Sequence, residues 1–171
     1  QLRRRLDFLL KKFEYLHIDL LLICCNTLSN IYLHNKYHVT YKVKTILETN
    51  LQHLKNKNIL VTENLKKFYL KDQRFIACNI ASAIENNEIE NLIKEIKSLK
   101  SNKALILGCT HYSLAKNVFD HYCSFKVVTY EDEFIDKLKS SDNLKFFGRK
   151  YEIEIFKKYF PQNDIELYEL S

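Results

Sequence analysis

Two short segments of the chain place a cysteine directly in front of small polar residues. They are Cys25-Asn26-Thr27 and Cys109-Thr110-His111. Each cysteine follows a short apolar run typical of a buried strand, and each precedes a helical pattern. The free amides at the start of a helix bind anions and favour a thiolate over a thiol. The sequence therefore predicts two reactive thiols, each beside an anion-binding turn.

Zinc binding is the alternative chemistry for these segments. The ligands would be Cys24, Cys25, Cys109 and His111. No pair of them has the spacing of a zinc finger, and adjacent cysteines on a strand point to opposite faces. We therefore expect no metal site. The remaining cysteines are expected to be small buried hydrophobic residues; they are Cys24, Cys78 and Cys123.

Short apolar runs and helical stripes alternate along the whole chain. The predicted strands are residues 20–25, 43–47, 58–62, 75–78, 104–107, 127–128, 144–147 and 165–168. The predicted helices are residues 2–13, 26–36, 84–100, 110–120, 134–138 and 151–160. Such alternation predicts an α/β fold with mainly parallel sheets flanked by helices. Ligands bind such sheets at the carboxyl ends of strands, where both cysteine segments lie.

The composition narrows the function classes. With Gly 2 and Pro 1, the chain has no Gly-rich phosphate loop. The net charge of +6 is a weak signal for nucleic acid and fits an ordinary solvated surface. The longest apolar run, Leu20 to Cys25, is too short to span a bilayer. We therefore expect neither nucleic acid nor a membrane as partner.

The cysteine usage and the first residues bear on where the protein works. The 5 cysteines show no CxxC spacing, and no leading apolar segment resembles a signal peptide. A cytoplasmic, reducing location fits this usage best. Because the chain begins with Gln and contains no Met, we expect a further N-terminal segment upstream.

The two cysteine segments resemble the signature motifs of one enzyme family. LICCNTLS at residues 22–29 resembles the A-C-N-T-A-S segment of glutamate racemases, and LILGCTHYSL at residues 105–114 resembles their LGCTHYPL signature. The resemblance to this part of the aspartate/glutamate racemase superfamily implies two pseudo-symmetric α/β lobes with the active site between them. One lobe would combine residues 1–45 with 127–171, and the other would span 46–126. The resemblance also implies an enzyme without a cofactor, and it is compatible with a homodimer.

The resemblance further implies that Cys25 and Cys109 are the two bases of a racemase. One thiolate would remove the α-proton of glutamate while the other thiol delivers a proton to the opposite face. The substrate-binding residues would be Asn26, Thr27, Thr62, Thr110 and His111. His111 would also position or protonate Cys109, and it points to glutamate because relatives acting on aspartate carry Glu at this place. The product, D-glutamate, would supply peptidoglycan for the cell wall.

The chain departs from the family pattern at several places. The family's first strand, with an Asp-Ser pair, and its Pro-Tyr-Gly turn have no counterpart after Gln1. Thr62 is kept where the family has two threonines, and Cys78-Asn79 replaces Cys-Pro. Ser113 stands where Pro is common, and Glu85 lies in the region of the family's acidic residue.

These departures leave other functions open. The missing Asp-Ser pair favours a catalytically decayed relative or an interaction protein that keeps the fold. An aspartate racemase is another alternative, and the Arg3 to Arg5 run leaves a nucleic-acid binder. If the chain is a fragment of a longer enzyme, we expect it to be inactive and poorly stable alone, because its first lobe would lack a central strand.

Overall fold

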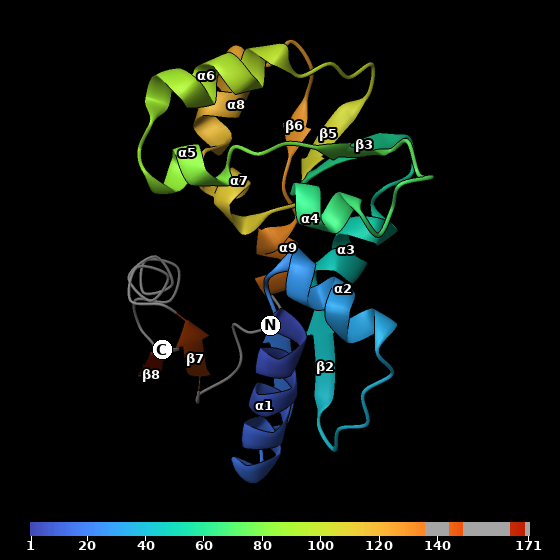
Figure 1. Cartoon of the computed structure of the whole chain (residues 1–171), viewed down its shortest axis with the longest axis vertical. Helices are drawn as coiled ribbons and strands as arrows, with labels where there is room; N and C mark the ends of the chain where they lie inside the picture. Colours follow the sequence, from blue (N-terminus) through green and yellow to red (C-terminus); the bar gives the residue numbers. More distant parts are fainter. Residues whose placement is uncertain (136–143, 149–164, 170–171) are drawn as a thin grey trace. The chain divides into compact units, whose positions relative to one another are not determined.

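A computed structural model describes residues 1–135, 144–148 and 165–169 of the chain (Figure 1). The chain divides into two compact units, Gln1–Phe134 and Ile135–Ser171, and each is described by itself. The first half of the first unit contains α1 (Leu2–Tyr15), β1 (Leu20–Ile23), α2 (Asn26–His34), β2 (Lys42–Thr45), α3 (Ile46–Gln52), β3 (Lys57–Val61) and α4 (Glu63–Lys66). It continues with β4 (Phe75–Ala77), α5 (Ala81–Glu85), α6 (Ile89–Ser98), β5 (Ala104–Leu107), α7 (Thr110–Leu114), α8 (Lys116–Tyr122), β6 (Val127–Val128) and the start of α9 (Glu131–Ile135).

A four-stranded parallel sheet is the centre of this unit, with strand order β4-β3-β5-β6. Its strands are mostly apolar because helices cover both faces, and the polar residues of β3, Lys57 and Asn58, stand at its start. Along β3, Leu60 packs into the cluster beneath α5 to α8, while Ile59 and Val61 pack into the cluster beneath α3 and α4. All three side chains are completely buried. Figure 1 shows the same two layers, with α5 to α8 on one side of the sheet and α3 and α4 on the other.

A second parallel pair, β1 and β2, lies beside α1. The apolar stripe of α1 is buried through Leu6, Leu10 and Phe13. The chain between α2 and β2 fastens this helix, since the Tyr41 hydroxyl donates a hydrogen bond to the Leu10 carbonyl at 3.0 Å. The helix that was predicted over residues 2–13 is confirmed, and it extends to Tyr15.

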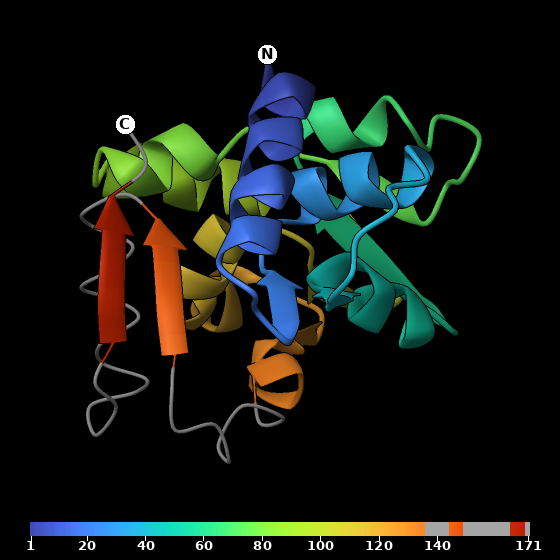
Figure 2. The ribbon, with the colours of Figure 1, turned by 90° about the horizontal axis from the view of Figure 1, so that it is seen from below.

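The described part of the second unit is another parallel pair. β7 (Leu144–Gly148) and β8 (Ile165–Glu169) run side by side, with Leu144 opposite Ile165 (Figure 2). Both strands confirm the sequence prediction at 144–147 and 165–168. The helix predicted over residues 151–160 lies outside the described residues.

The mixed α/β fold with parallel sheets is therefore confirmed, and several element boundaries are corrected. The strand predicted over 43–47 ends at Thr45, because the Thr45 hydroxyl accepts a hydrogen bond from the Glu48 amide and caps a new helix, α3. The single helix predicted over 84–100 is two helices, since Asn87 has a positive φ of 57° and ends α5. The helix after Cys109 is likewise divided at Ala115 into α7 and α8.

The predicted first lobe includes residues 127–171. Its first two residues, Val127 and Val128, instead pair with β5 in the four-stranded sheet. The division of the chain into two racemase lobes otherwise stays a prediction. In the described residues no helix is long and apolar enough to cross a membrane.

The hydrogen bond that fastens α1 can be tested by removing one oxygen. Tyr41 is 8% exposed, so Tyr41→Phe removes a buried hydrogen bond to the Leu10 carbonyl and leaves that carbonyl only its helical bond. We expect the free energy of unfolding to fall by about 1–2 kcal/mol, measured by urea denaturation. Tyr15→Phe is the matched control, because Tyr15 is 84% exposed and its loss of a hydroxyl should change stability little. Equal effects of the two variants would contradict the assigned role of Tyr41.

Candidate active site

The end of β5 sets the position of Cys109. Gly108 follows the strand, and its amide donates a hydrogen bond to the Leu60 carbonyl of β3 at 2.8 Å. A Cβ at this position would lie 2.6 Å from Ile59 Cγ1 and 2.8 Å from the Leu60 carbonyl oxygen. Both distances are shorter than real contacts allow, so only glycine lets the two strands approach here. Cys109 then forms the N-cap of α7 in an extended conformation.

α7 is held against the sheet by its tyrosine. Tyr112 is completely buried, and its hydroxyl donates a hydrogen bond of 2.7 Å to the carbonyl of Cys78, directly after β4. The amides of Tyr112 and Ser113 in turn bond to the Cys109 carbonyl. The first turn of α7 is therefore fixed both to the neighbouring strand and to the cysteine.

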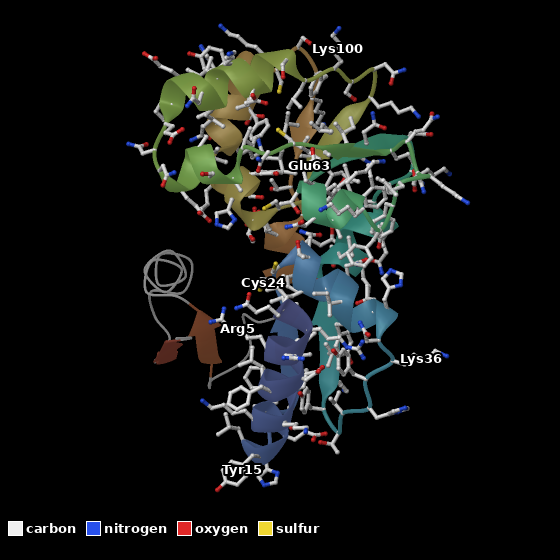
Figure 3. The ribbon with its side chains drawn as sticks, viewed as in Figure 1. Arg5, Tyr15, Cys24, Lys36, Glu63 and Lys100 are labelled. Carbon is white, nitrogen blue, oxygen red and sulfur yellow. The ribbon has the colours of Figure 1, made fainter. Side chains whose placement is uncertain are left out.

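Cys25 occupies the corresponding place after β1. Cys24, labelled in Figure 3, follows the strand, and Cys25 is the N-cap of α2. The Ser29 amide donates to the Cys25 carbonyl at 2.8 Å, and the buried Ser29 hydroxyl donates to the Ile23 carbonyl at 3.2 Å. These two bonds fold the chain sharply from strand into helix, as the sequence predicts.

The fold brings the two predicted thiols together. A negative charge on Cys25 raises the pKa of the Cys109 thiol, so the two sulfur atoms are near enough to interact electrostatically. They come from the carboxyl ends of strands in two different sheets. The structure therefore brings the two thiols within reach of each other's charge, and their role as a catalytic pair stays a prediction.

The expectation that both thiols are activated is wrong for Cys109. Burial raises the pKa of its thiol from 9.0 to about 12, and the charges of Cys25 and Glu131 act in the same direction. The amides of His111 and Tyr112 lower the pKa, as a helix N-terminus should, but less strongly. The helix is only five residues long, and desolvation of a thiolate outweighs it. Cys109 is therefore a protonated thiol at neutral pH.

His111 lies between Cys109 and an acidic side chain. Its Nδ1 is 3.7 Å from the Cys109 sulfur, and its Nε2 is 2.8 Å from Glu85 Oε1 on α5. A carboxylate accepts hydrogen bonds, so in a neutral ring the proton sits on Nε2 and Nδ1 accepts from the thiol. Glu85 thereby fixes the orientation of His111 toward Cys109.

The other predicted substrate residues have different surroundings. Thr62 ends β3 and caps α4, where its hydroxyl accepts from the Leu65 amide at 3.3 Å. β3 and β5 are parallel neighbours, so Thr62 and Cys109 share one edge of the sheet. Figure 3 labels Glu63, the next residue along the chain. Thr27 and Thr110 are half-buried in the first turns of α2 and α7.

Asn26 contributes to packing as well as to the candidate site. It is 4% exposed, and its Oδ1 accepts a hydrogen bond of 3.0 Å from Asn50 Nδ2 on α3. The structure therefore gives its amide oxygen a buried partner that the sequence did not predict.

Glu131 is a further residue near the site that sequence reasoning missed. It begins α9, and Ser113 donates a hydrogen bond of 2.5 Å to its Oε1. Burial, together with the charge of Asp132, raises the pKa of the Glu131 carboxyl to about 7, although the bond from Ser113 lowers it. No motif signals this pair, because its members come from different elements. Among residues 1–135 and the two tail strands, no three metal-ligating side chains gather.

Comparisons with known proteins place the fold. No family model and no curated protein sequence matches the chain. Solved structures do match. The glutamate racemase isoform RacE1 from Bacillus anthracis superposes with a TM-score of 0.68 and 15% identity, covering 100% of this chain and 82% of that one. The glutamate racemase from Campylobacter jejuni gives 0.58 and 21%, covering 99% and 74%.

A third match is the glutamate racemase from Francisella tularensis, solved in complex with D-glutamate. Its TM-score is 0.62 at 18% identity, and the match covers 99% of this chain and 81% of that one. Identities this low establish the architecture rather than the activity. The chain has the fold of glutamate racemases.

The close approach of β5 and β3 predicts the effect of one methyl group. Gly108→Ala would force the Ile59 side chain and the Leu60 carbonyl apart, which should lower the free energy of unfolding by about 1–3 kcal/mol. Urea denaturation measures this loss. Lys103→Ala, an exposed change just before the same strand, is the control and should have little effect. Unchanged stability of Gly108→Ala would show that β3 can move away and that this contact does not fix Cys109.

The buried Glu131 carboxyl predicts a pH-dependent stability. Its pKa is raised from 4.5 to about 7, so the folded chain favours the protonated form and loses stability as the pH rises between these values. Glu131→Gln cannot ionise and escapes this loss. Its stability relative to the original chain should therefore be greater at pH 8 than at pH 5, measured by urea denaturation at both. Glu90→Gln, an exposed carboxyl on α6, should show no such difference. A pH-independent gap for Glu131→Gln would contradict the burial of a neutral carboxyl.

Proposed function

We propose that the protein is a cofactor-independent amino-acid racemase that interconverts L- and D-glutamate with Cys25 and Cys109 as its two bases. The observation that carries this proposal is that the two cysteines occupy equivalent places, each as the N-cap of the helix after a parallel strand, and that the charge of Cys25 acts on the Cys109 thiol. The racemase fold and the resemblance of both cysteine motifs support it.

The proposed reaction needs one base and one acid on opposite faces of the α-carbon. Breaking the Cα–H bond transfers a proton to the Cys25 thiolate, and the Cys109 thiol delivers its proton to the other face. The raised pKa of Cys109 suits it to the second role, because it holds a proton at neutral pH. Reaction of the other enantiomer uses the same groups in the opposite roles.

His111 and Glu85 are proposed to adjust Cys109 during this exchange. A neutral ring that donates from Nε2 to Glu85 presents Nδ1 to the sulfur, where it can accept the thiol hydrogen. When Cys109 must act as the base, Nδ1 takes the thiol proton, and the resulting imidazolium, paired with Glu85, offsets part of the cost of the buried thiolate. The same residue thus serves both directions of the reaction.

The substrate would be held by the polar residues at the strand ends. We propose that Asn26, Thr27, Thr62, Thr110 and His111 contact its carboxylate and ammonium groups, together with helix-terminal amides. Glutamate is preferred over aspartate because His111 follows Cys109-Thr110. We propose that the protein works in the cytoplasm and that its product, D-glutamate, is used to build peptidoglycan.

The second candidate is a non-catalytic protein that keeps the racemase fold. The raised pKa of Cys109 favours it, because a thiol with a pKa of about 12 is a poor base until something compensates its burial. Asn26, whose amide oxygen is already bonded to Asn50, has less freedom to bind a substrate. The two candidates are separated by proton exchange at the substrate's α-carbon.

Proton exchange in deuterium oxide tests the two-thiol mechanism. The protein should introduce deuterium at the α-carbon of both glutamate enantiomers without an added cofactor, as followed by NMR and chiral chromatography. Cys25→Ala and Cys109→Ala should each lower racemisation by at least about 100-fold, because each removes one of the two proton carriers. Cys78→Ala and Cys123→Ala are controls that should cost about 1–2 kcal/mol of stability and leave the rate within about threefold.

Each other outcome changes the assignment in a defined way. Exchange with aspartate but not glutamate would replace the substrate and keep the mechanism. No exchange in either amino acid by the folded protein would favour the non-catalytic candidate. Loss of activity in folded Cys78→Ala as large as in Cys109→Ala would mean that the site has been assigned to the wrong thiol.

A further inference from the structure

Glu131 is a buried carboxyl that the proposed mechanism does not use. Desolvation is the main cause of its raised pKa, so the folded chain carries a cost for keeping an ionisable group here. Buried carboxyls of this kind are kept at functional sites when their charge acts on a neighbour. The neighbour that the structure provides is the Cys109 thiol.

Two contacts hold Glu131 in place. On one side, the Ser113 hydroxyl donates its hydrogen bond to Glu131 Oε1, and the Ser113 amide bonds to the Cys109 carbonyl at 3.3 Å. One serine therefore connects the carboxyl to the first turn of α7, directly beside the cysteine. Figure 1 shows α9 close to α7, in agreement with this contact.

On the other side, His53 fastens α9 to the end of α3. The ring of His53 stacks on Tyr130 with centroids 3.9 Å apart and planes 8° from parallel. Its Nε2 lies 2.9 Å from Glu133 Oε2. Tyr130 and Glu133 lie on either side of Glu131 in the sequence. The contacts of His53 with these two residues, together with the bond from Ser113, therefore determine where the Glu131 carboxyl lies.

The groups in the described residues that act on the Cys109 thiol come from different elements. Cys25 at the start of α2 and Glu131 on α9 disfavour its thiolate, and the amides of His111 and Tyr112 favour it. His111 contacts the sulfur while bonded to Glu85 of α5. Asp132 acts on Glu131 from within α9. Glu131 is thus the side chain whose charge can add to that of Cys25 in keeping Cys109 neutral.

We propose that Glu131, held by Ser113, is a positioning residue that keeps the proton on Cys109 between turnovers. A carboxylate near a thiol raises the energy of the thiolate by Coulomb repulsion, and the effect is strong where water is excluded. The inference rests on the proposed racemase function, since it assigns the resting protonation state of one of the two bases.

The consequence for the reaction is a directed return of the proton. After one turnover the Cα–H bond has broken toward Cys25 and a new one has formed from Cys109, so Cys25 is a thiol and Cys109 a thiolate. A proton must then leave Cys25 and reach Cys109 through solvent before the cycle repeats. The Glu131 charge favours this return, because it raises the energy of the thiolate at Cys109.

Maleimide labelling of the full chain tests the proposal without requiring racemase activity. N-ethylmaleimide reacts with thiolates, so its rate at Cys109, followed by peptide mass spectrometry, reports the thiolate fraction. Glu131→Gln keeps the hydrogen-bond acceptor for Ser113 and removes the charge. We expect its labelling rate to equal that of the original chain at pH 6, where Glu131 is mostly protonated, and to exceed it by about threefold at pH 8.5, which corresponds to about half a unit in the thiol pKa.

Glu133→Gln is the matched control. It removes the same charge from the same helix and leaves His53 a neutral acceptor in place of an ion pair, so it reports any loosening of α9 while Glu131 keeps its charge. The quantity compared is the Cys109 labelling rate of the variant divided by that of the original chain. A change in this ratio between pH 6 and pH 8.5 for Glu131→Gln, absent from Glu133→Gln, supports the proposal. An equal rate increase at both pH values, or no increase in a folded variant, overturns it.

A second variant decides the case if Glu131→Gln does not fold. Ser113→Ala releases the carboxyl from its hydroxyl partner, and it should show the same pH-dependent increase to a smaller extent. If folded Ser113→Ala shows no pH-dependent increase in labelling rate, the proposal is overturned. Racemisation is assayed separately: a labelling shift without racemisation contradicts the proposed function alone, whereas racemisation without the shift contradicts the role of Glu131 alone.

Discussion

The close approach of β3 and β5 at Gly108 is the constraint on which the geometry of the candidate site depends. The Gly108 amide bonds to the Leu60 carbonyl, and no side chain fits between the strands at this point. The carboxyl ends of β3 and β5 thereby lie side by side at the same edge of the sheet. Thr62 and Cys109, which follow these strands, share that edge. α7 then starts close enough to the sheet for Tyr112 to bond to the Cys78 carbonyl. Moving β5 outward would displace all of these groups together.

The same close packing determines the chemistry of Cys109. A thiol pressed against the end of a buried sheet loses most of its water, and the loss raises its pKa to about 12 despite two amides directed at it. Cys109 is therefore protonated at neutral pH. Any action of this thiol as a base depends on the contact with His111, whose orientation is set by Glu85. Burial and the histidine act in opposite directions on this thiol, as the proposed two-way proton transfer would require.

Sequence reasoning succeeds where one physical effect dominates. The predicted strand 104–107 is confirmed residue for residue, because a strand covered on both faces must be a continuous apolar run. It fails where several weak effects compete. The helices α3 and α4 are too short for a clear stripe, and only the caps Thr45 and Thr62 signal them. The lowered thiol pKa was wrong because desolvation cannot be read from neighbours in sequence. The Ser113–Glu131 contact joins residues 18 apart with no shared pattern.

The relation between the two thiols depends on side chains rather than on strand pairing. In the described residues, β1 and β2 form a sheet separate from the four strands that carry Cys109. α2 is instead linked to α3 by the bond from Asn50 to Asn26, and to the segment after α4 by the bond from the Tyr69 hydroxyl to Asn30 Oδ1 at 2.9 Å.

Buried amide pairs of this kind add little net stability, about 0.5–1.5 kcal/mol each, but they are directional, and leaving one partner alone costs more. The Nδ2 of Asn30 already lacks a partner. An apolar contact would permit α2 to slide along α3, whereas these bonds fix one register. Because Cys25 is the residue before α2, its distance from Cys109 is set by that register. The asparagine beside the cysteine thus contributes to the position of Cys25 through the helix that it begins.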